Sequence, residues 1–184
     1  MLDVEKISLD GVLIIRPKQF GDNRGFFSET YNKRLFLQAG IDAEFVQDNH
    51  SFSKEKGVLR GLHYQLHPHA QGKLVRVTKG RVFDVAVDIR KSSPTFKQWT
   101  GVELSADNWT QFYIPPGFAH GFLTLEENCE FLYKVTDFYA PQCDRAIRFN
   151  DPDIAVNWPL NAANFVLSEK DLNAPFLKGA DIFD

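Results

Sequence analysis

Alternating hydrophobic and polar positions run along most of this chain and predict strands from near its start to near its end. In the clearest case Phe83, Val85 and Val87 alternate with Asp84 and Asp88, which is the period of two of a strand with one buried face. Clusters of Gly, Pro, Asn and Asp separate such segments and predict turns. The segments expected to be extended are 12–17, 45–53, 58–65, 73–89, 98–105, 110–115, 120–125, 130–139 and 146–150.

Turn and helix signals complete the expected organisation. Lys79-Gly80 stands between two extended runs and predicts a hairpin turn. One short helix is expected over residues 32–39, with Gly40 just past its end, and one or two more between Ser168 and the last residue. Many strands in about 150 residues favour a sandwich or barrel, with a jelly roll among the candidates. The length of 184 residues predicts one domain over 1–184.

Composition narrows the function classes. The net charge of −3 carries no basic excess, so neither a nucleic-acid groove nor a membrane surface is expected as a partner. The first residues include acids, unlike a signal peptide, and no apolar run approaches the roughly 18 residues of a membrane span. Two cysteines, Cys129 and Cys143, without a CxxC spacing are expected as free thiols. We therefore expect a cytoplasmic protein, rich in aromatic residues (14%) that suit sheets and flat ligands.

The histidines raise and then weaken the idea of a metal site. The turn with Pro115, Gly117 and His120 resembles the second motif of the cupins, which are small jelly-roll barrels. The first cupin motif binds a metal through His-x-His and a following Glu, but here His67-Pro-His69 is followed by Lys73 at the place of the Glu. A protonated Lys has no lone pair and repels a divalent ion. We predict no metal and no cofactor; a metal-dependent oxygenase using His67, His69 and His120 is the alternative.

Three residues form a set suited to proton transfer. His63 can act as a base, Lys73 can stabilise an oxyanion, and Tyr133 can return a proton. Lys73 shares its side of a strand with Val75 and Val77, so it is expected to point into the barrel. Removal of a proton beside a ketone on one face and its return on the other inverts the carbon. The residues make epimerisation a chemical possibility.

Long motifs, in order and correctly spaced over nearly the whole chain, give a close resemblance. They resemble those of the dTDP-4-dehydrorhamnose 3,5-epimerase family, a metal-free, cupin-type, homodimeric jelly roll. The resemblance implies inversion of C3 and C5 of dTDP-4-dehydro-6-deoxy-D-glucose to give dTDP-4-dehydro-L-rhamnose, in dTDP-L-rhamnose biosynthesis. The motifs are residues 20–29 (FGDNRGFFSE), 60–65 (RGLHYQ), 71–77 (QGKLVRV) and 115–122 (PPGFAHGF), with Lys170 and Asp171 near the end.

The resemblance also implies roles for individual residues. It makes His63 the base, Asp171 the carboxylate that orients it, Tyr133 the proton donor and Lys73 the residue near the C4 oxygen. Arg24 and Glu29 are expected to reach the nucleotide from the partner subunit of a homodimer. The remaining expected contacts are Arg60 and His120 with the diphosphate or sugar, Gln47 and Asn49 with the sugar or phosphate, Phe20 and Tyr139 with the thymine, and Asp144 and Lys170 with further polar groups.

Two departures and two further alternatives accompany this interpretation. Strict alternation puts Arg60 and His63 on opposite faces of a strand, so a bulge at Gly61 is needed if both meet the substrate. Phe52 stands where a polar or basic residue is expected in many relatives. A single-carbon epimerase or ketoisomerase on the same sugar is the closest alternative. A non-catalytic sensor of nucleotide sugars is another.

Overall fold

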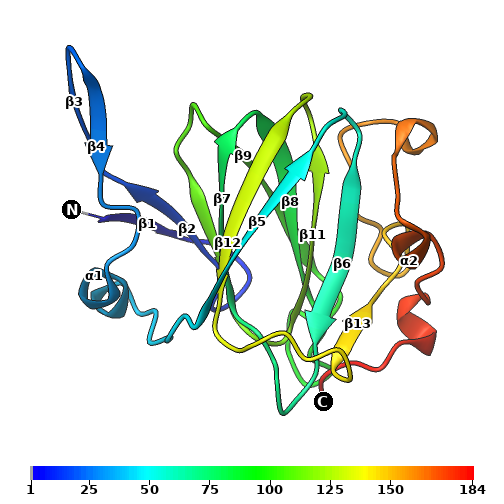
Figure 1. Ribbon diagram of the computed structural model, residues 1–184. Helices are drawn as coiled ribbons and strands as arrows, with labels where there is room; N and C mark the ends of the chain where they lie inside the picture. Colours follow the sequence, from blue (N-terminus) through cyan, green and yellow to red (C-terminus); the bar gives the residue numbers. More distant parts are fainter. Residues whose placement is uncertain (1) are drawn as a thin grey trace.

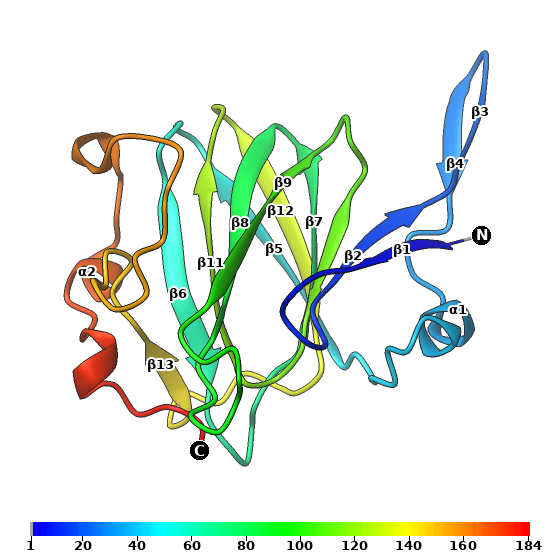
Figure 2. The ribbon, with the colours of Figure 1, turned by 180° about the vertical axis from the view of Figure 1, so that it is seen from behind.

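A computed structural model describes residues 2–184 and shows two facing antiparallel sheets (Figures 1 and 2). One sheet has the strand order β1 (Leu2–Lys6), β2 (Leu13–Pro17), β10 (Gln111–Ile114), β7 (Lys73–Lys79), β12 (Cys129–Val135) and β5 (Gln47–Ser53). The other has the order β13 (Asp144–Ala146), β6 (Leu59–Gln65), β11 (Phe118–Thr124), β8 (Arg81–Asp88) and β9 (Trp99–Ser105). This confirms the predicted all-β, cupin-like jelly roll, here as two sheets that strand pairing does not join within residues 2–184.

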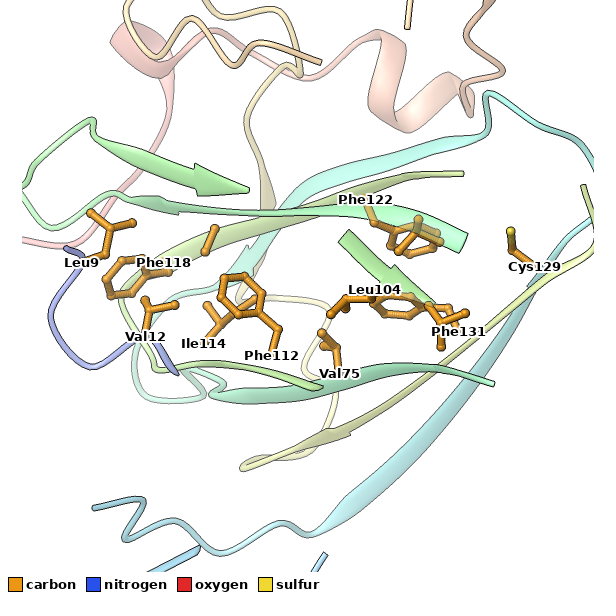
Figure 3. Close-up of a cluster of buried hydrophobic side chains, with 13 residues drawn as sticks. Leu9, Val12, Val75, Leu104, Phe112, Ile114, Phe118, Phe122, Cys129 and Phe131 are labelled. Carbon is orange, nitrogen blue, oxygen red and sulfur yellow. The ribbon is translucent and has the colours of Figure 1, made fainter. Parts of the chain in front are cut away.

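The core lies between the two sheets and holds them together. Figure 3 shows Val75, Phe112 and Phe131 of one sheet facing Leu104 and Phe122 of the other. The rings of Phe122 and Phe131 stack with centroids 4.1 Å apart. Burying a large apolar side chain stabilises a fold by roughly 1.5–3 kcal/mol. The packed layer therefore fixes the spacing of the strands that carry the polar residues described below.

The prediction that β8 buries only one face is wrong. Val85 and Val87 pack against residues of the C-terminal segment, among them Ile147 and Leu177, outside the five-stranded sheet. Asp84 points the other way, as do Val82 and Ala86 of the core between the sheets, and it is also fully buried. The alternation of residue types did not predict the burial of the second face, because the sequence does not distinguish a buried carboxylate from a solvent-exposed one.

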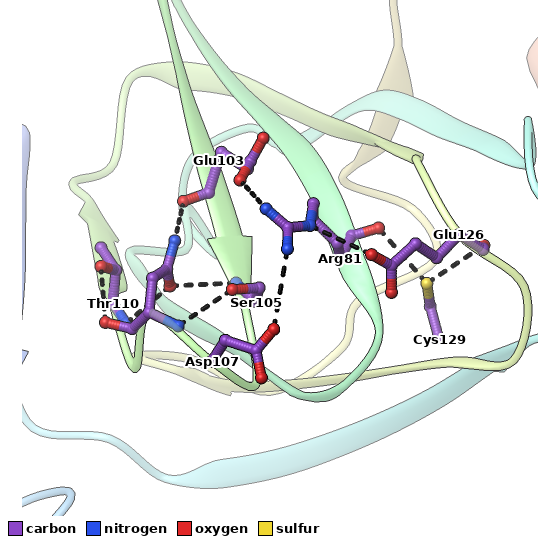
Figure 4. A network of polar contacts seen from close by, with 8 residues as sticks. Arg81, Glu103, Ser105, Asp107, Thr110, Glu126 and Cys129 are labelled. Atoms are coloured by element: carbon purple, nitrogen blue, oxygen red, sulfur yellow. Dashed lines mark hydrogen bonds and ion pairs between the residues drawn. The ribbon is translucent and has the colours of Figure 1, made fainter.

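The predicted hairpin at Lys79-Gly80 is also wrong. β7 lies in the six-stranded sheet and β8 in the five-stranded sheet, so the chain changes sheets at Gly80. Gly80 has φ +75°, and a Cβ there would lie 2.6 Å from Sγ of Cys129. Beside this corner Arg81 pairs with Glu103 at 2.5 Å and with Glu126 at 3.1 Å (Figure 4). Long-range packing, which a two-residue signal does not contain, decides that the strands part here.

The predicted helices are present and short. α1 (Lys33–Gln38) starts at the N-cap Asn32, whose side chain accepts from two backbone amides, and Gly40 follows it at φ +91°. α2 (Glu169–Leu172) is capped by Ser168. Two 3-10 turns, η1 (Ala162–Asn164) and η2 (Leu177–Gly179), complete the helical elements. No helix within residues 2–184 has the length and apolar character needed to cross a membrane.

Three strands near the N-terminus were not expected, and one strand near residue 146 was expected at the wrong position. β1 extends the six-stranded sheet through β2, and β3 (Gln19–Asp22) pairs with β4 (Gly25–Ser28). In Figures 1 and 2 this second hairpin projects away from the sheets, on the side of the molecule opposite α2. The strand expected over residues 146–150 is instead β13, which ends at Ala146. The projecting hairpin carries several of the predicted site residues.

Candidate active site

A cavity of about 410 Å³ opens between the two sheets beside α2. This volume lies within the usual range of small-molecule sites. Both sheets and the short helix contribute to its walls, so residues far apart in sequence meet there. Its lining includes these predicted site residues: Arg60, His63, Lys73, His120, Tyr133 and Asp171.

A bulge in β6 lets Arg60 and His63 line the same cavity. His63 pairs with His120 and Arg60 pairs with Phe122, so β6 has two residues where β11 has only Gly121. Gly61, one of the two, has φ +127°, and a Cβ on it would lie 2.5 Å from Cα of Gly121. Only glycine fits this backbone and this close approach. The bulge required by the sequence pattern is therefore present.

His63 is held by a buried carboxylate. Its Nε2 lies 2.5 Å from Oδ1 of Asp171, and the Ser168 hydroxyl donates to the other carboxylate oxygen at 2.7 Å. Burial opposes ionisation of Asp171, but the hydrogen bonds from His63 and Ser168 outweigh it and lower the Asp171 pKa. An ionised carboxylate only accepts, so Nε2 of His63 carries the hydrogen and Nδ1 keeps its lone pair. This is the tautomer of a base that accepts a proton at Nδ1.

Lys73 is a buried cation at the same cavity. Its side chain is on β7 with Val75 and Val77, as the alternation predicted, and its ammonium donates to the backbone carbonyl of His63 at 3.3 Å. Burial lowers the pKa of Lys73 to about 8, while the charges of Asp84 and Asp144 oppose that shift. The group is thus cationic at neutral pH and close to losing its charge.

Tyr133 enters the cavity from β12. It shares its side of the strand with Phe131, whose ring centroid is 6.0 Å from that of Tyr133. Burial raises the pKa of the Tyr133 phenol, which Arg60 partly offsets. The hydroxyl therefore carries its proton at neutral pH and can donate it.

His120 forms a second histidine–carboxylate pair. Both oxygens of Asp84 lie 3.0 Å from Nε2 of His120, and burial lowers the pKa of His120 and raises that of Asp84. Sequence reasoning did not select Asp84. The available signal was its place in β8, where a polar residue shares a face with Val82 and Ala86.

A smaller pocket of about 210 Å³ shares His63, Lys73 and Tyr133 with the main cavity. In it Lys170 pairs with Asp144 at 2.5 Å, and the Tyr139 hydroxyl donates to the same carboxylate at 3.3 Å. Gln65 and Gln71 also line it and were not among the predicted residues. Besides His63, Lys73 and Tyr133, the predicted residues that line it are Gln47, Asn49, Tyr139, Asp144 and Lys170.

Three predicted residues lie elsewhere. Phe20 and Arg24 belong to the projecting β3–β4 hairpin and line a shallow pocket there, and Glu29 directly follows β4. Arg24 is largely exposed, and its ion pair within the described residues 2–184 is a local one, with Asp22 at 2.5 Å. Because the hairpin projects on the side opposite α2, these residues do not meet His63 and Asp171 within one chain (Figure 1).

The histidines of the alternative metal site do not converge. His67 is exposed and packs its ring against Phe183, while His69 pairs with Asp137 at 3.1 Å. His120 faces Asp84 inside the fold. Across residues 2–184, no cluster of three or more His, Cys, Asp or Glu side chains is arranged to hold a metal ion. The geometry gives the oxygenase alternative no support.

The two-sheet fold with histidine–carboxylate pairs, a lysine and a tyrosine around one cavity defines a cupin-like jelly-roll enzyme with groups for proton transfer. The family model of dTDP-4-dehydrorhamnose 3,5-epimerase matches residues 6–179, and the chain belongs to this family. The dTDP-4-dehydrorhamnose 3,5-epimerase of Shigella flexneri is 55% identical over 183 residues, 99% of each chain.

Two solved structures illustrate the structural likeness. A dTDP-6-deoxy-D-glucose-3,5-epimerase from Legionella pneumophila, in complex with dTDP-4-keto-L-rhamnose, has a TM-score of 0.93 and 50% identity, covering 98% of this chain and 95% of its own. A 3'-monoepimerase from Streptomyces bikiniensis, in complex with dTDP-quinovose, has a TM-score of 0.86 and 34% identity, covering 94% and 86%. Both relatives are sugar epimerases, and they differ in the number of carbons that their names describe.

Proposed function

We propose that this chain epimerises C3 and C5 of dTDP-4-dehydro-6-deoxy-D-glucose to give dTDP-4-dehydro-L-rhamnose, without a metal or cofactor. One observation carries the proposal: His63, with Nδ1 left free by Asp171, shares a cavity with protonated Lys73 and Tyr133. The 55% identity to a 3,5-epimerase over nearly the full chain supports the double inversion. The nucleotide-sugar complex of the Legionella relative supports the substrate class.

The proposed chemistry uses each group once per inversion. Nδ1 of His63 takes the proton beside the C4 ketone, and the C–H electron pair moves to form an enolate. The Lys73 ammonium stabilises the negative C4 oxygen. Tyr133 then gives its proton to the opposite face of the carbon, where the enolate's electron pair forms the new C–H bond. The C4 ketone re-forms and Tyr133 is left as a phenolate. Before the next inversion the His63 imidazolium releases its proton to water and the Tyr133 phenolate regains one from water, so both groups return to their starting states.

The nucleotide is proposed to lie away from the reacting carbons. Arg60 and His120 are proposed to contact the diphosphate or sugar, and Gln47 and Asn49 the sugar or phosphate. Tyr139 is more than half exposed at the rim, as expected for a ring that stacks on thymine. Asp144 and Lys170 are proposed as further polar contacts. Binding energy from the nucleotide then positions the sugar at the base and acid.

The proposal includes a homodimer that completes the nucleotide site. Phe20, Phe26 and Phe27 are all more than half exposed on the β3–β4 hairpin, an unusual set of rings for a free surface. We propose that this hairpin brings Phe20 and Arg24, with Glu29, to the nucleotide site of the partner subunit. The fold's own geometry, which keeps these residues away from their chain's cavity, supports that arrangement.

Arg24→Ala tests this contact. Losing a phosphate or nucleotide contact made equally in ground and transition states raises KM and leaves kcat nearly unchanged. We expect KM to rise about tenfold, which corresponds to roughly 1.4 kcal/mol. Steady-state kinetics measure it, with the exposed Arg34→Ala as the matched control. An unchanged KM would remove Arg24 from the nucleotide site.

The Lys73 pKa predicts the alkaline limb of the pH profile. Burial holds this pKa at about 8, so the cationic form is complete well below pH 8 and is lost as the pH rises through that value. We expect kcat to decline above about pH 8. In Lys73→Arg the guanidinium stays charged at alkaline pH. We therefore expect this variant to be slower than the wild type but to show no decline of kcat above about pH 8. Lys79→Arg, at the exposed end of β7, is the control. A decline that persists unchanged in Lys73→Arg would assign it to another group.

The closest alternative is inversion at a single carbon. The likeness to a 3'-monoepimerase supports this alternative, because enzymes that invert one carbon and enzymes that invert two share the same fold. Proton NMR of the product distinguishes the two, because only a 3,5-epimerase inverts both centres. A ketoisomerase would move the ketone instead, and a sensor would bind the nucleotide sugar without changing it.

A further inference from the structure

A carboxylate lies in the apolar interior of the fold, on β8. Asp84 has no exposed surface, and its neighbours on the same face of the strand, Val82 and Ala86, belong to the core between the sheets. An ionised group there is unfavourable unless other charges compensate it. Packing does not require an acid at this position, because Ala86 satisfies the same environment two residues away. The carboxylate therefore calls for a role beyond the core.

The partners of Asp84 lie at the catalytic cavity. Both of its oxygens are 3.0 Å from Nε2 of His120, and within residues 2–184 His120 is the only side chain in hydrogen-bond contact with it. Lys73 lines the same cavity as His120, and its ammonium donates to a backbone carbonyl rather than to a carboxylate. A negative charge on Asp84 opposes the lowering of the Lys73 pKa, and the charges of His120 and Lys73 in turn oppose the rise that burial causes in the Asp84 pKa. Asp84 thus contacts His120 and influences the charge of Lys73, two groups that line the catalytic cavity.

The two other carboxylates around the cavities already have partners. Asp171 pairs with His63, and Asp144 pairs with Lys170. β5 and β9 present the neutral Ser51 and Leu104 to the interior. The titratable groups that line the main cavity and the smaller pocket are Arg60, His63 and Tyr64 from β6, Lys73 from β7, His120 from β11, Tyr133 from β12, Tyr139 beyond it, Asp144 from β13, and Lys170 and Asp171 from α2.

We propose that Asp84 is a positioning residue that keeps Lys73 cationic and fixes the ring of His120 through Nε2, so that positive charge is in place where the enolate oxygen forms. This deepens, and rests on, the proposed epimerase function. Without Asp84, Lys73 would be a buried cation with less compensating charge, and it would release its proton at lower pH. The substrate's ketone would then meet a neutral amine over part of the working pH range.

Asp84→Asn tests the proposal because the amide oxygen still accepts from His120 while the charge is lost. We expect the alkaline limb of kcat to move to lower pH by about one unit, with the rate at pH 6 close to wild type. At pH 9 the rate should be about tenfold below wild type. KM for the nucleotide sugar should change little. A merely structural residue would lower the rate equally at all pH values.

Asp88→Asn is the matched control. Asp88 is a buried carboxylate on the same face of the same strand, but its partners are Arg90, Ser93 and Thr95, away from the cavity. Its pH profile should keep the wild-type limb even if the protein unfolds at lower temperature. Asp84→Ser, which removes the charge without adding bulk, gives the same test if Asp84→Asn does not fold.

A titration that does not depend on turnover separates this proposal from the proposed function. The ¹³C NMR signal of the Lys73 ε-carbon, assigned by its absence in Lys73→Arg, should titrate at lower pH in the Asp84 variants than in the wild type and Asp88→Asn. An unchanged titration overturns the role of Asp84, whatever the reaction. A shifted titration in an enzyme without epimerase activity would overturn the proposed function instead.

Discussion

His63→Ala is expected to lower the epimerisation rate by about 10³-fold and to abolish exchange of the substrate's C3 and C5 protons with solvent. The physical reason is the loss of Nδ1, the lone pair that the contact between Nε2 and Asp171 leaves available. Without it no positioned base is left to take the first proton, so the enolate and the inverted product form only at the residual rate and exchange falls below detection. Proton NMR of the substrate in D₂O, followed over time, measures both effects.

His67→Ala is the matched control for this variant. His67 is an exposed histidine against Phe183, and it belongs to the metal-binding alternative rather than to the cavity. We expect its rate to equal that of the wild type. Equal losses in His67→Ala and His63→Ala would contradict the base assignment and revive the metal-dependent alternative. Circular dichroism of both variants confirms that the fold is kept.

Tyr133→Phe is expected to separate proton removal from inversion. The base remains, so the enolate still forms and the C3 and C5 protons still exchange with D₂O. The hydroxyl that returns a proton to the opposite face is gone, so formation of the inverted product should fall by about 10²- to 10³-fold. NMR reports deuterium in the substrate and the amount of inverted product in the same sample.

Tyr113→Phe provides the comparison. Tyr113 is a buried tyrosine on β10 that packs with Leu13 and Phe36, outside the catalytic cavity. Its loss of a hydroxyl should leave the rate unchanged. If Tyr133→Phe produced inverted sugar at the wild-type rate, another acid would have to serve the opposite face. If it lost exchange as well as inversion, Tyr133 would be needed before the enolate forms.

The strand pattern was predictable where each strand buries apolar residues at a period of two, as in β7 and β12. The features that were missed depend on distant contacts. The change of sheet at Gly80 follows from packing against Cys129, and the buried state of Asp84 follows from His120, 36 residues away. The projecting β3–β4 hairpin contains paired aromatic residues without regular alternation, so no periodic signal marked it. A single domain over 1–184 stays a prediction.

In the candidate site, too, residue types and motifs were predictable from sequence, whereas features that depend on distant contacts were not. His63, Lys73 and Tyr133 were predicted from their side-chain chemistry and from the family motifs, and the fold brings them together at one cavity. The bulge at Gly61 was inferable because Arg60 and His63 otherwise face opposite ways. The net charge of −3 could not reveal Arg60, Lys73 and Lys170 gathered around the cavities, since acids elsewhere balance them. Asp84 was missed because its role depends on groups from other strands.

Solvent exchange at two carbons tests the central claim most directly. The wild-type protein is incubated in D₂O with dTDP-4-dehydro-6-deoxy-D-glucose, and the product is examined by NMR for deuterium and configuration. The proposed double epimerisation predicts one deuterium at C3 and one at C5, with both centres inverted, and no change on treatment with a metal chelator. Exchange and inversion at one carbon only, or intact nucleotide-sugar binding without any exchange, would contradict it.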